Sequence, residues 1–347
     1  MNKNYYITTP IYYVNDKPHI GHAYTTILAD TISRFRALVG EKPTFLTGLD
    51  EHGLKVQQAA EKNGKAPQDH CDSMAPAFID LWKKLNINYS DFIRTTEHRH
   101  TKIVQQILTK VHESGDIYMD EYEGWYSISE ERFITEKELD SGQFGDVKKI
   151  KEKNYFFKMS KYQANLIDKI EKDELLIQPK SRKNEVLGFL KNELSDLCIS
   201  RPKSRLEWGI ELPFDDNYVT YVWFDALINY ISAIGAYSND EQFSSLWPAD
   251  VHLIGKDILT THSVYWPTML LSLGLPLPQR IFAHGWWLTD DQKMSKSLGN
   301  VVSPLMLIDD FGVDSVRYYL MSEMVLGMDA TFSSESFEKK YNSDLAN

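Results

Sequence analysis

The sequence predicts an α/β protein in which a parallel sheet, covered by helices on both faces, is interrupted by an inserted domain. Two observations support this class. Segments rich in β-forming residues alternate with helix-like apolar patterns in residues 1–115 and again in residues 214–290. Residues 116–213, between these stretches, are richer in charge and mix lysine with glutamate, which favours a separate unit.

The first half of the sheet is expected in residues 1–115. Residues 5–9 are rich in β-formers and stop at Pro10, so they predict a strand, and residues 44–47 predict a second one. A helix is expected over residues 23–39, before Gly40. Apolar residues three and four positions apart predict another helix that ends near Gly115.

The pattern resumes after the insert, which itself is expected to hold helices around 162–171 and 183–192. Strands are then predicted at 218–223, 251–254 and 280–284. Helices are predicted at 224–234 and 259–271. Residues 291–347 begin with a polar loop and continue with helices around 305–310 and 313–323. The final residues read as the interior of a helix, so we expect the sequence to stop inside a longer structure.

Composition narrows the class of function. The net charge of −11 argues against a protein that coats nucleic acid without sequence preference. No apolar run reaches the roughly 18–20 residues of a membrane helix, and the start of the chain lacks a signal-peptide pattern. Cys71 and Cys198 are far apart in the sequence, which fits a reducing cytoplasm. Three basic runs are either parts of an RNA-binding patch or solvated surface: 148–151, 180–183 and 201–205.

The segment His19-Ile20-Gly21-His22 is the first candidate site. It follows the first expected strand and opens the first long helix, whose N-terminus offers unpaired N–H groups and a positive potential. Gly21 permits close approach of a ligand, and the two imidazoles are able to donate hydrogen bonds to phosphate oxygens. The alternative interpretation is two unrelated surface histidines.

The second candidate is Lys293-Met294-Ser295-Lys296-Ser297, which lies in a polar loop before a glycine. Two ammonium groups three residues apart are able to hold a polyphosphate as point charges. A lone basic loop is usually solvated surface, but this pattern is more specific.

The two motifs, in this order and separated by an interrupted α/β sheet, resemble those of class I aminoacyl-tRNA synthetases. Further segments resemble the bacterial methionyl-tRNA synthetase family, namely residues 5–26, 48–53, 221–226, 255–258 and 283–286. The resemblance implies a Rossmann-like nucleotide-binding fold with an inserted α+β connective domain, a KMSKS loop and a helical segment. It also implies an ATP- and Mg²⁺-dependent ligase that converts L-methionine to methionyl-adenylate and transfers it to the 3′ end of methionine tRNA.

The resemblance assigns the residues of the site. Methionine is expected to contact Ile11, Tyr13, Asp50, Trp223, Ala226, Leu227, Tyr230, Ile258 and His262. ATP is expected to contact His19, Gly21, His22, Gly255, Asp257, Lys293 and Lys296. The catalytic groups would be those that stabilise charge on the phosphates: His19, His22, Lys293 and Lys296.

The chemistry of these residues suits the substrates. Aromatic walls fit a polarizable thioether, Asp50 pairs with the substrate ammonium, and Tyr13 and His262 are expected to donate hydrogen bonds to the sulfur. Asp257 follows a strand and a glycine, where its carboxylate would accept hydrogen bonds from ribose hydroxyls. The alternative for Asp257 is a helix N-cap, and the alternative for the aromatic residues is core packing. Leu227 replaces a proline found in some relatives, so the rim of the pocket differs there.

The insert departs from relatives that bind zinc there. Ser127 and Glu130 stand where those relatives have the thiols of a zinc knuckle, and residues 140–145 contain no second pair. A structural zinc site needs about four such ligands. We therefore expect no structural zinc and no other protein-held metal.

The expected partners are L-methionine, ATP and methionine tRNA, with neither a membrane nor DNA. Binding of tRNA is expected to be weak, because the helical domain that reads the anticodon in the family would begin where this sequence stops. Two other hypotheses remain. One is a different class I synthetase or nucleotidyltransferase; the other is a catalytically idle paralogue that serves as an RNA- or protein-binding module.

Overall fold

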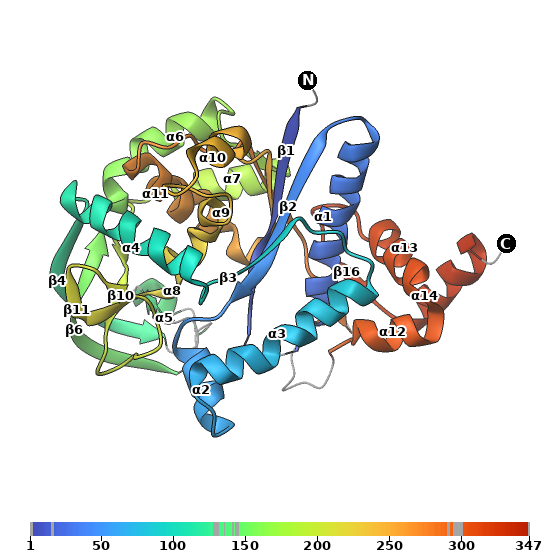
Figure 1. Cartoon of the computed structure of the whole chain (residues 1–347), viewed down its shortest axis with the longest axis horizontal. Coiled ribbons are helices and arrows are strands. Elements are labelled where there is room, and N and C mark those ends of the chain that lie inside the picture. The colour runs from blue at the N-terminus through green and yellow to red at the C-terminus, as the bar shows by residue number, and fades with distance from the viewer. Residues whose placement is uncertain are drawn as a thin grey trace.

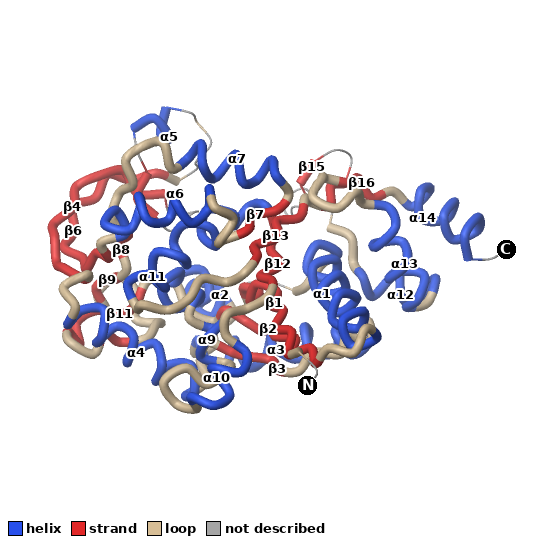
Figure 2. The backbone as a smooth tube through the Cα atoms, turned by 90° about the horizontal axis from the view of Figure 1, so that it is seen from above, coloured by secondary structure: helices blue, strands red, loops and turns tan. Residues whose placement is uncertain are grey.

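The computed structural model describes residues 3–14, 17–127, 132–134, 136–140, 142, 146–289, 292–293 and 301–345. Its centre is a parallel six-stranded sheet with the order β3-β2-β1-β12-β13-β7. The strands are β1 (Asn4–Tyr13), β2 (Lys42–Asp50), β3 (Asp91–Arg94), β7 (Leu176–Gln178), β12 (Val251–Gly255) and β13 (Arg280–His284). Figure 2 shows them as a central column with helices on both sides. The predicted α/β class is therefore confirmed, as are the four strands predicted within β1, β2, β12 and β13.

Both faces of the sheet are buried, as alternation along β1 requires. Tyr5 and Ile7 pack with one set of helices, whereas Tyr6 between them packs with another. The first set includes α1 (Ile20–Leu38), α3 (Pro67–Lys84) and α13 (Val313–Glu323). The second set includes α4 (His98–Glu113), α6 (Gln163–Glu171), α9 (Asn229–Ser232) and α11 (Trp266–Ser272). The helix expected at 23–39 thus begins three residues earlier, at Ile20.

Two small antiparallel sheets lie to one side of the central sheet, at the left of Figure 1. The first sheet contains β4 (Ile117–Ser127), β5 (Arg132–Ile134), β6 (Val147–Phe157) and β8 (Leu197–Cys198). The second contains β9 (Ser200–Pro202), β10 (Glu211–Leu212) and β11 (Asp215–Thr220). The remaining short elements before β12 are α2 (Leu54–Lys62), α5 (Glu136–Asp140), η1 (Met159–Tyr162), α7 (Lys180–Phe189) and α10 (Asp240–Leu246).

The range predicted to be an insert, 116–213, also contributes to the central sheet. β7 pairs in parallel with β13, and Ile177 lies opposite Ile281. α6 precedes β7 and packs into the core on one face of that sheet. The domain boundaries remain a prediction, and this pairing argues that 116–213 is not a single separate unit.

The strand predicted at 218–223 is wrong in its end and in its sheet. β11 ends at Thr220 and pairs with antiparallel β9 and β10, and helix α8 (Val222–Leu227) begins directly after Tyr221. The run of β-branched and aromatic residues favours a strand, but packing of α8 against the core overrides this local preference. Trp223 is therefore on a helix, next to residues Ala226 and Leu227 of the predicted site.

The C-terminal part packs against the face of the central sheet that α1 covers. A three-stranded sheet joins β14 (Trp287–Thr289), β15 (Gln292–Lys293) and β16 (Ala330–Phe332). The helices in this region are α12 (Pro304–Phe311), α13, α14 (Ser334–Lys340) and the π-helical turn η5 (Tyr341–Leu345). The helix predicted at 259–271 is divided into η3 (Thr261–Tyr265), a π-helical segment, and α11. Among the described residues, no helix is long and apolar enough to cross a membrane.

The three basic runs form ion pairs with neighbouring carboxylates. Lys149 and Lys151 on β6 pair with Glu123 and Glu121 across the strand, both at 3.2 Å. Lys183 pairs with Asp173 at 2.6 Å. Arg201 is buried, with 3% of its surface exposed. These contacts favour solvated or internal salt bridges over an RNA-binding patch.

Candidate active site

A pocket of about 400 Å³ opens at the carboxyl ends of the central strands. Its walls include the ends of β1 at Tyr13, β2 at Asp50, β12 at Gly255 and β13 at His284. Open parallel sheets bind ligands at this edge, and the volume lies within the range of small-molecule sites.

The structure brings most of the predicted site residues together in this pocket. All nine residues predicted for methionine line it: Ile11, Tyr13, Asp50, Trp223, Ala226, Leu227, Tyr230, Ile258 and His262. Five residues predicted for ATP line it as well: His19, Gly21, His22, Gly255 and Asp257. We call these two groups the methionine half and the nucleotide half of the pocket. The ligand that each residue contacts remains a prediction.

The side chains of the two predicted loop lysines lie outside the described part of the structure. Lys296 lies outside the described residues, and only the backbone of Lys293 is described, in β15. The two flanks of the loop are nevertheless placed near the pocket. Lys293 lies opposite Leu288 on β14, next to the pocket residue Trp287. Beyond the loop, the carbonyl of Val302 accepts a hydrogen bond of 3.3 Å from the amide of Ile20 at the start of α1.

His19 and His22 form a capping box at the start of α1. Nδ1 of His19 accepts from the amide of Gly21 at 3.0 Å, and Nδ1 of His22 accepts from the amide of His19 at 3.1 Å. In a neutral imidazole the other nitrogen must then carry the proton. Each ring therefore holds its N–H at Nε2, as a donor for a ligand.

These contacts correct one expectation from the sequence. The helix N-terminus was expected to offer unpaired amide groups, but His19 caps the amides of Gly21 and His22, and Val302 accepts from Ile20. Anion recognition at this point thus falls to the histidine side chains and the helix dipole. Burial, together with the charge of His19, lowers the pKa of His22 well below its usual value, so the ring is neutral at pH 7.

His262 is held between two partners in the methionine half. Its Nδ1 lies 2.9 Å from the carbonyl of Ile258, which only accepts, so Nδ1 carries a proton. Burial lowers the pKa of His262 to about 4, so the ring is neutral and Nε2 is an acceptor at pH 7. Nε2 accepts from the Tyr230 hydroxyl at 2.6 Å. The expectation that His262 donates to the thioether sulfur is therefore wrong in this arrangement, whereas Tyr13 remains a candidate donor.

Asp257 belongs to the short helical turn η2 (Lys256–Ile258), whose N-cap is Gly255 without a side-chain cap. The alternative role of Asp257 as a helix N-cap thus has no support here. Its Oδ1 accepts from the indole N–H of Trp286 at 3.2 Å. A Cβ atom on Gly255 would lie 2.5 Å from the same oxygen, so a larger residue at this position would displace the Asp257 carboxylate.

Sequence reasoning missed several residues of the pocket wall. They are Pro10, Tyr12, Tyr24, Thr25, Asn229, His284, Gly285, Trp286 and Trp287. Residues 284–287 follow the end of β13, which is the position where parallel sheets place ligand-binding loops. Strand position was therefore a usable signal for Trp286, whereas Tyr24 and Thr25 on α1 had none beyond the nearby histidine motif.

No protein-held metal site is evident within the described ranges, where no three histidine, cysteine or acidic side chains cluster. Ser127 is buried in β4, while Glu130 lies outside these ranges. Cys71 and Cys198 are both free thiols. The expected absence of zinc stays a prediction.

Comparisons with known proteins agree on one family. The model of the family "tRNA synthetases class I (M)" matches residues 5–143 and 140–347. A methionine–tRNA ligase of Clostridium tetani is 54% identical, over 99% of this chain and 54% of that protein. The chain thus spans about half the length of the curated relatives it matches.

Solved structures give the same answer. Mycobacterium tuberculosis methionyl-tRNA synthetase in complex with methionyl-adenylate matches with a TM-score of 0.95 and 42% identity, over 99% of this chain and 69% of that one. The free form of the mycobacterial enzyme matches with a TM-score of 0.83 and 39% identity, over 100% of this chain and 67% of that one. With a pocket at the carboxyl ends of the strands and a family match along almost its whole length, the chain belongs to the class I tRNA synthetases of the methionine type.

Proposed function

We propose that this chain activates L-methionine with ATP to form methionyl-adenylate and pyrophosphate, in the cytoplasm. The observation that carries the proposal is the single pocket in which all nine predicted methionine residues meet five predicted nucleotide residues. The solved relative with the TM-score of 0.95 contains methionyl-adenylate, and the free form of that enzyme is less similar, at 0.83.

The reaction needs positioning more than proton transfer. The substrate carboxylate is already ionised, so it attacks the α-phosphate without a general base, and pyrophosphate leaves. Asp50 would orient the substrate by pairing with its ammonium group. The Nε2–H groups of His19 and His22 would stabilise the charge that develops on the phosphates, with Lys293 and Lys296 acting from the loop.

The residues present fit a nucleotide that arrives with Mg²⁺. Mg²⁺ is usually bound through one or two carboxylates together with substrate phosphates, so a dedicated protein cage is not required. Asp257 is a carboxylate in the nucleotide half, and its Oδ1 is already engaged by Trp286. Bound Mg²⁺ would supply neutralisation of phosphate charge.

Transfer of the methionyl group to methionine tRNA is part of the same proposal. It rests on the family and on the printed names of relatives that are about twice as long as this chain.

The test is a pyrophosphate-exchange assay on the purified chain with each of the twenty amino acids. Exchange that depends on methionine supports the proposal. Exchange with a different amino acid would instead show another class I specificity. No exchange with any amino acid, from a folded preparation that still binds RNA or protein, would indicate the idle paralogue.

A further inference from the structure

Behind the methionine half lies a carboxylate, Asp225, that the proposed reaction does not use. It is fully buried on α8, between the pocket residues Trp223 and Ala226. Its Oδ2 lies 2.6 Å from Nδ1 of His52, and its Oδ1 lies 2.7 Å from Nε2 of His100. Both histidines are buried as well.

The chemistry of this cluster fixes its hydrogen bonds. Burial acts to raise the pKa of Asp225, but the charge of His52 and the hydrogen bonds from both histidines outweigh it and lower the pKa to about 2. An ionised carboxylate only accepts, so each histidine donates to it. His100 then uses its other nitrogen, Nδ1, to contact the Ser232 hydroxyl at 2.8 Å on α9.

The cluster connects two parts of the pocket wall. His52 is two residues after Asp50, the proposed partner of the substrate ammonium, at the end of β2. Asp225 is on the helix that carries Trp223, Ala226 and Leu227, the proposed wall around the substrate side chain. The bond between His52 and Asp225 therefore sets the distance between the group that would bind the ammonium and the wall that would bind the thioether.

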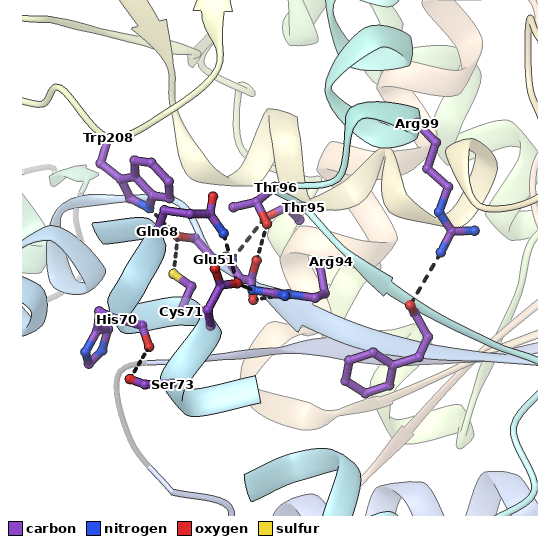
Figure 3. A network of polar contacts seen from close by, with 12 residues as sticks. Glu51, Gln68, His70, Cys71, Ser73, Arg94, Thr95, Thr96, Arg99 and Trp208 are labelled. Atoms are coloured by element: carbon purple, nitrogen blue, oxygen red, sulfur yellow. Dashed lines mark hydrogen bonds and ion pairs between the residues drawn. The ribbon is translucent and has the colours of Figure 1, made fainter. Parts of the chain in front are cut away.

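A second set of contacts holds Glu51, the residue between Asp50 and His52 (Figure 3). The buried Glu51 carboxylate accepts from Nε of Arg94 at 2.7 Å and from the Thr96 hydroxyl. Trp208 donates its indole N–H to the carbonyl of Glu51, and its ring packs against His52 at 5.4 Å between centroids. The Glu51 contacts thus hold the backbone beside Asp50, while the His52–Asp225 bond ties the same segment to α8.

We propose that Asp225 is a positioning residue for the amino-acid site, acting through His52 to hold Asp50 at the correct distance from the α8 wall. This inference rests on the proposed activation of methionine. It predicts that loss of the Asp225–His52 bond raises KM for methionine and lowers the preference for methionine over longer side chains. KM for ATP should stay unchanged.

The experiment compares Asp225→Asn with wild type in steady-state pyrophosphate exchange. Asparagine has nearly the same shape, but its amide nitrogen cannot accept from a histidine. We expect KM for methionine to rise by about tenfold, equivalent to ~1.4 kcal/mol, with KM for ATP within about twofold of wild type. The preference for methionine over ethionine, which is longer by one methylene, should also fall.

The matched control is Asp116→Asn. Asp116 is also a buried carboxylate, with hydrogen bonds to Lys161, Tyr162 and Ser272, but it does not line the pocket. The Asp116→Asn variant should lose thermal stability without a change in KM for methionine or for ATP. Equal effects of the two substitutions on KM for methionine and on the ethionine preference would overturn the proposal.

Two variants of His52 keep the proposal testable if Asp225→Asn does not fold. His52→Ala removes the link and should raise KM for methionine in the same way, whereas His52→Gln retains an N–H donor and should restore most of the loss. An unchanged KM for methionine in His52→Ala contradicts the inference. Wild-type protein that exchanges with no amino acid would refute the proposed function instead, so the two failures are distinguishable.

Discussion

The methionine half and the nucleotide half of the pocket are held in place by different kinds of interaction. The methionine half rests on fully buried groups, with Asp225 between two histidines and His262 between Tyr230 and Ile258. In the nucleotide half, Trp286 is bound by the ion pair of Lys256 and Asp329, whose side chains are 19% and 34% exposed.

This difference fits the two proposed substrates. A small, mostly apolar amino acid is selected by fixed walls, and buried, fully bonded polar groups hold such walls rigidly. A triphosphate must enter and pyrophosphate must leave, which requires charged groups that remain near solvent. We therefore expect substitutions in the nucleotide half to change the rate, and substitutions behind the methionine half to change substrate affinity and stability.

The largest effect is expected for His22→Ala. This change removes the Nε2–H that we place against the phosphates, and loss of one such donor typically lowers kcat by ~10²–10³-fold. Single-turnover formation of the adenylate should slow to that extent, with KM for methionine within about threefold of wild type. Lys296→Ala should slow the reaction similarly, which would place the loop over the phosphates.

The histidine assignment has its own control. His22→Asn keeps an acceptor for the His19 amide and a donor for a ligand, so it should recover part of the rate. A tenfold change in rate corresponds to ~1.4 kcal/mol. If the single-turnover rate of His22→Ala stays within about threefold of wild type, His22 does not stabilise the phosphates.

The next largest effect is the loss of folding stability in acid, to which His262 of the methionine half contributes. Burial lowers the pKa values of His22, His252, His262 and His284, that of His262 to about 4. Between pH 6.5 and 4 the unfolded chain therefore binds protons that the folded chain does not, and the free energy of unfolding must fall as the pH falls. Asp225 has the same sign but acts at lower pH, because its stabilising effect is lost only as the pH falls from the ordinary carboxyl pKa of 3.8 to the pKa of Asp225, about 2.

The contribution of His262 is measurable by urea unfolding at pH 7, 5 and 4. At ~1.4 kcal/mol per pKa unit, His262 accounts for on the order of 3 kcal/mol of the loss at pH 4. His262→Gln should lose less stability than wild type over this interval. A substitution of the exposed His98 to glutamine is the control and should follow the wild-type curve. Parallel curves for His262→Gln and wild type would mean that His262 is not held neutral.

Sequence patterns predicted the architecture and many residues of the pocket, but not the hydrogen bonds between its side chains. Strong periodicity identified β12, β13 and α13 almost to the residue, because burial on both faces leaves a clear apolar pattern. β7 was missed because three residues, Leu176–Gln178, are too few to show a period. The strand predicted at residues 218–223 was wrong in its end because the local preference for a strand continues into α8.

The site shows the same limit. Its residues were assigned from a resemblance in local segments, and a local segment does not indicate which distant group its side chain meets. Asp225 lies 173 residues from His52 and 125 from His100 in sequence. The use of Nδ1 of His262 by the Ile258 carbonyl is likewise a property of the folded π-helical turn, not of the residue types.

The smallest effect is expected for Asp329→Asn, beside the nucleotide half. Asp329 accepts from Nζ of Lys256 at 2.6 Å and from the amide of Trp286 at 2.8 Å, and Lys256 lies 4.1 Å from the centre of the Trp286 ring. Trp286 in turn bonds Asp257, so Asp329 supports the proposed ribose site from the segment before β16. A partly exposed pair of this kind contributes roughly 0.2–1 kcal/mol, which corresponds to at most about a fivefold change.

KM for ATP should therefore rise by about two- to fivefold in Asp329→Asn, and KM for methionine should stay unchanged. Asp329 does not line the pocket itself but bonds the pocket residue Trp286. Glu323→Gln is the matched control, because Glu323 forms a similar partly exposed pair with Lys340 at 2.8 Å, between α13 and α14. It should alter neither KM. The effect should shrink at high salt, as expected for exposed charges. If KM for methionine rises as much as KM for ATP, the two halves are mechanically coupled, and the comparison between a rigid methionine half and an independent nucleotide half fails.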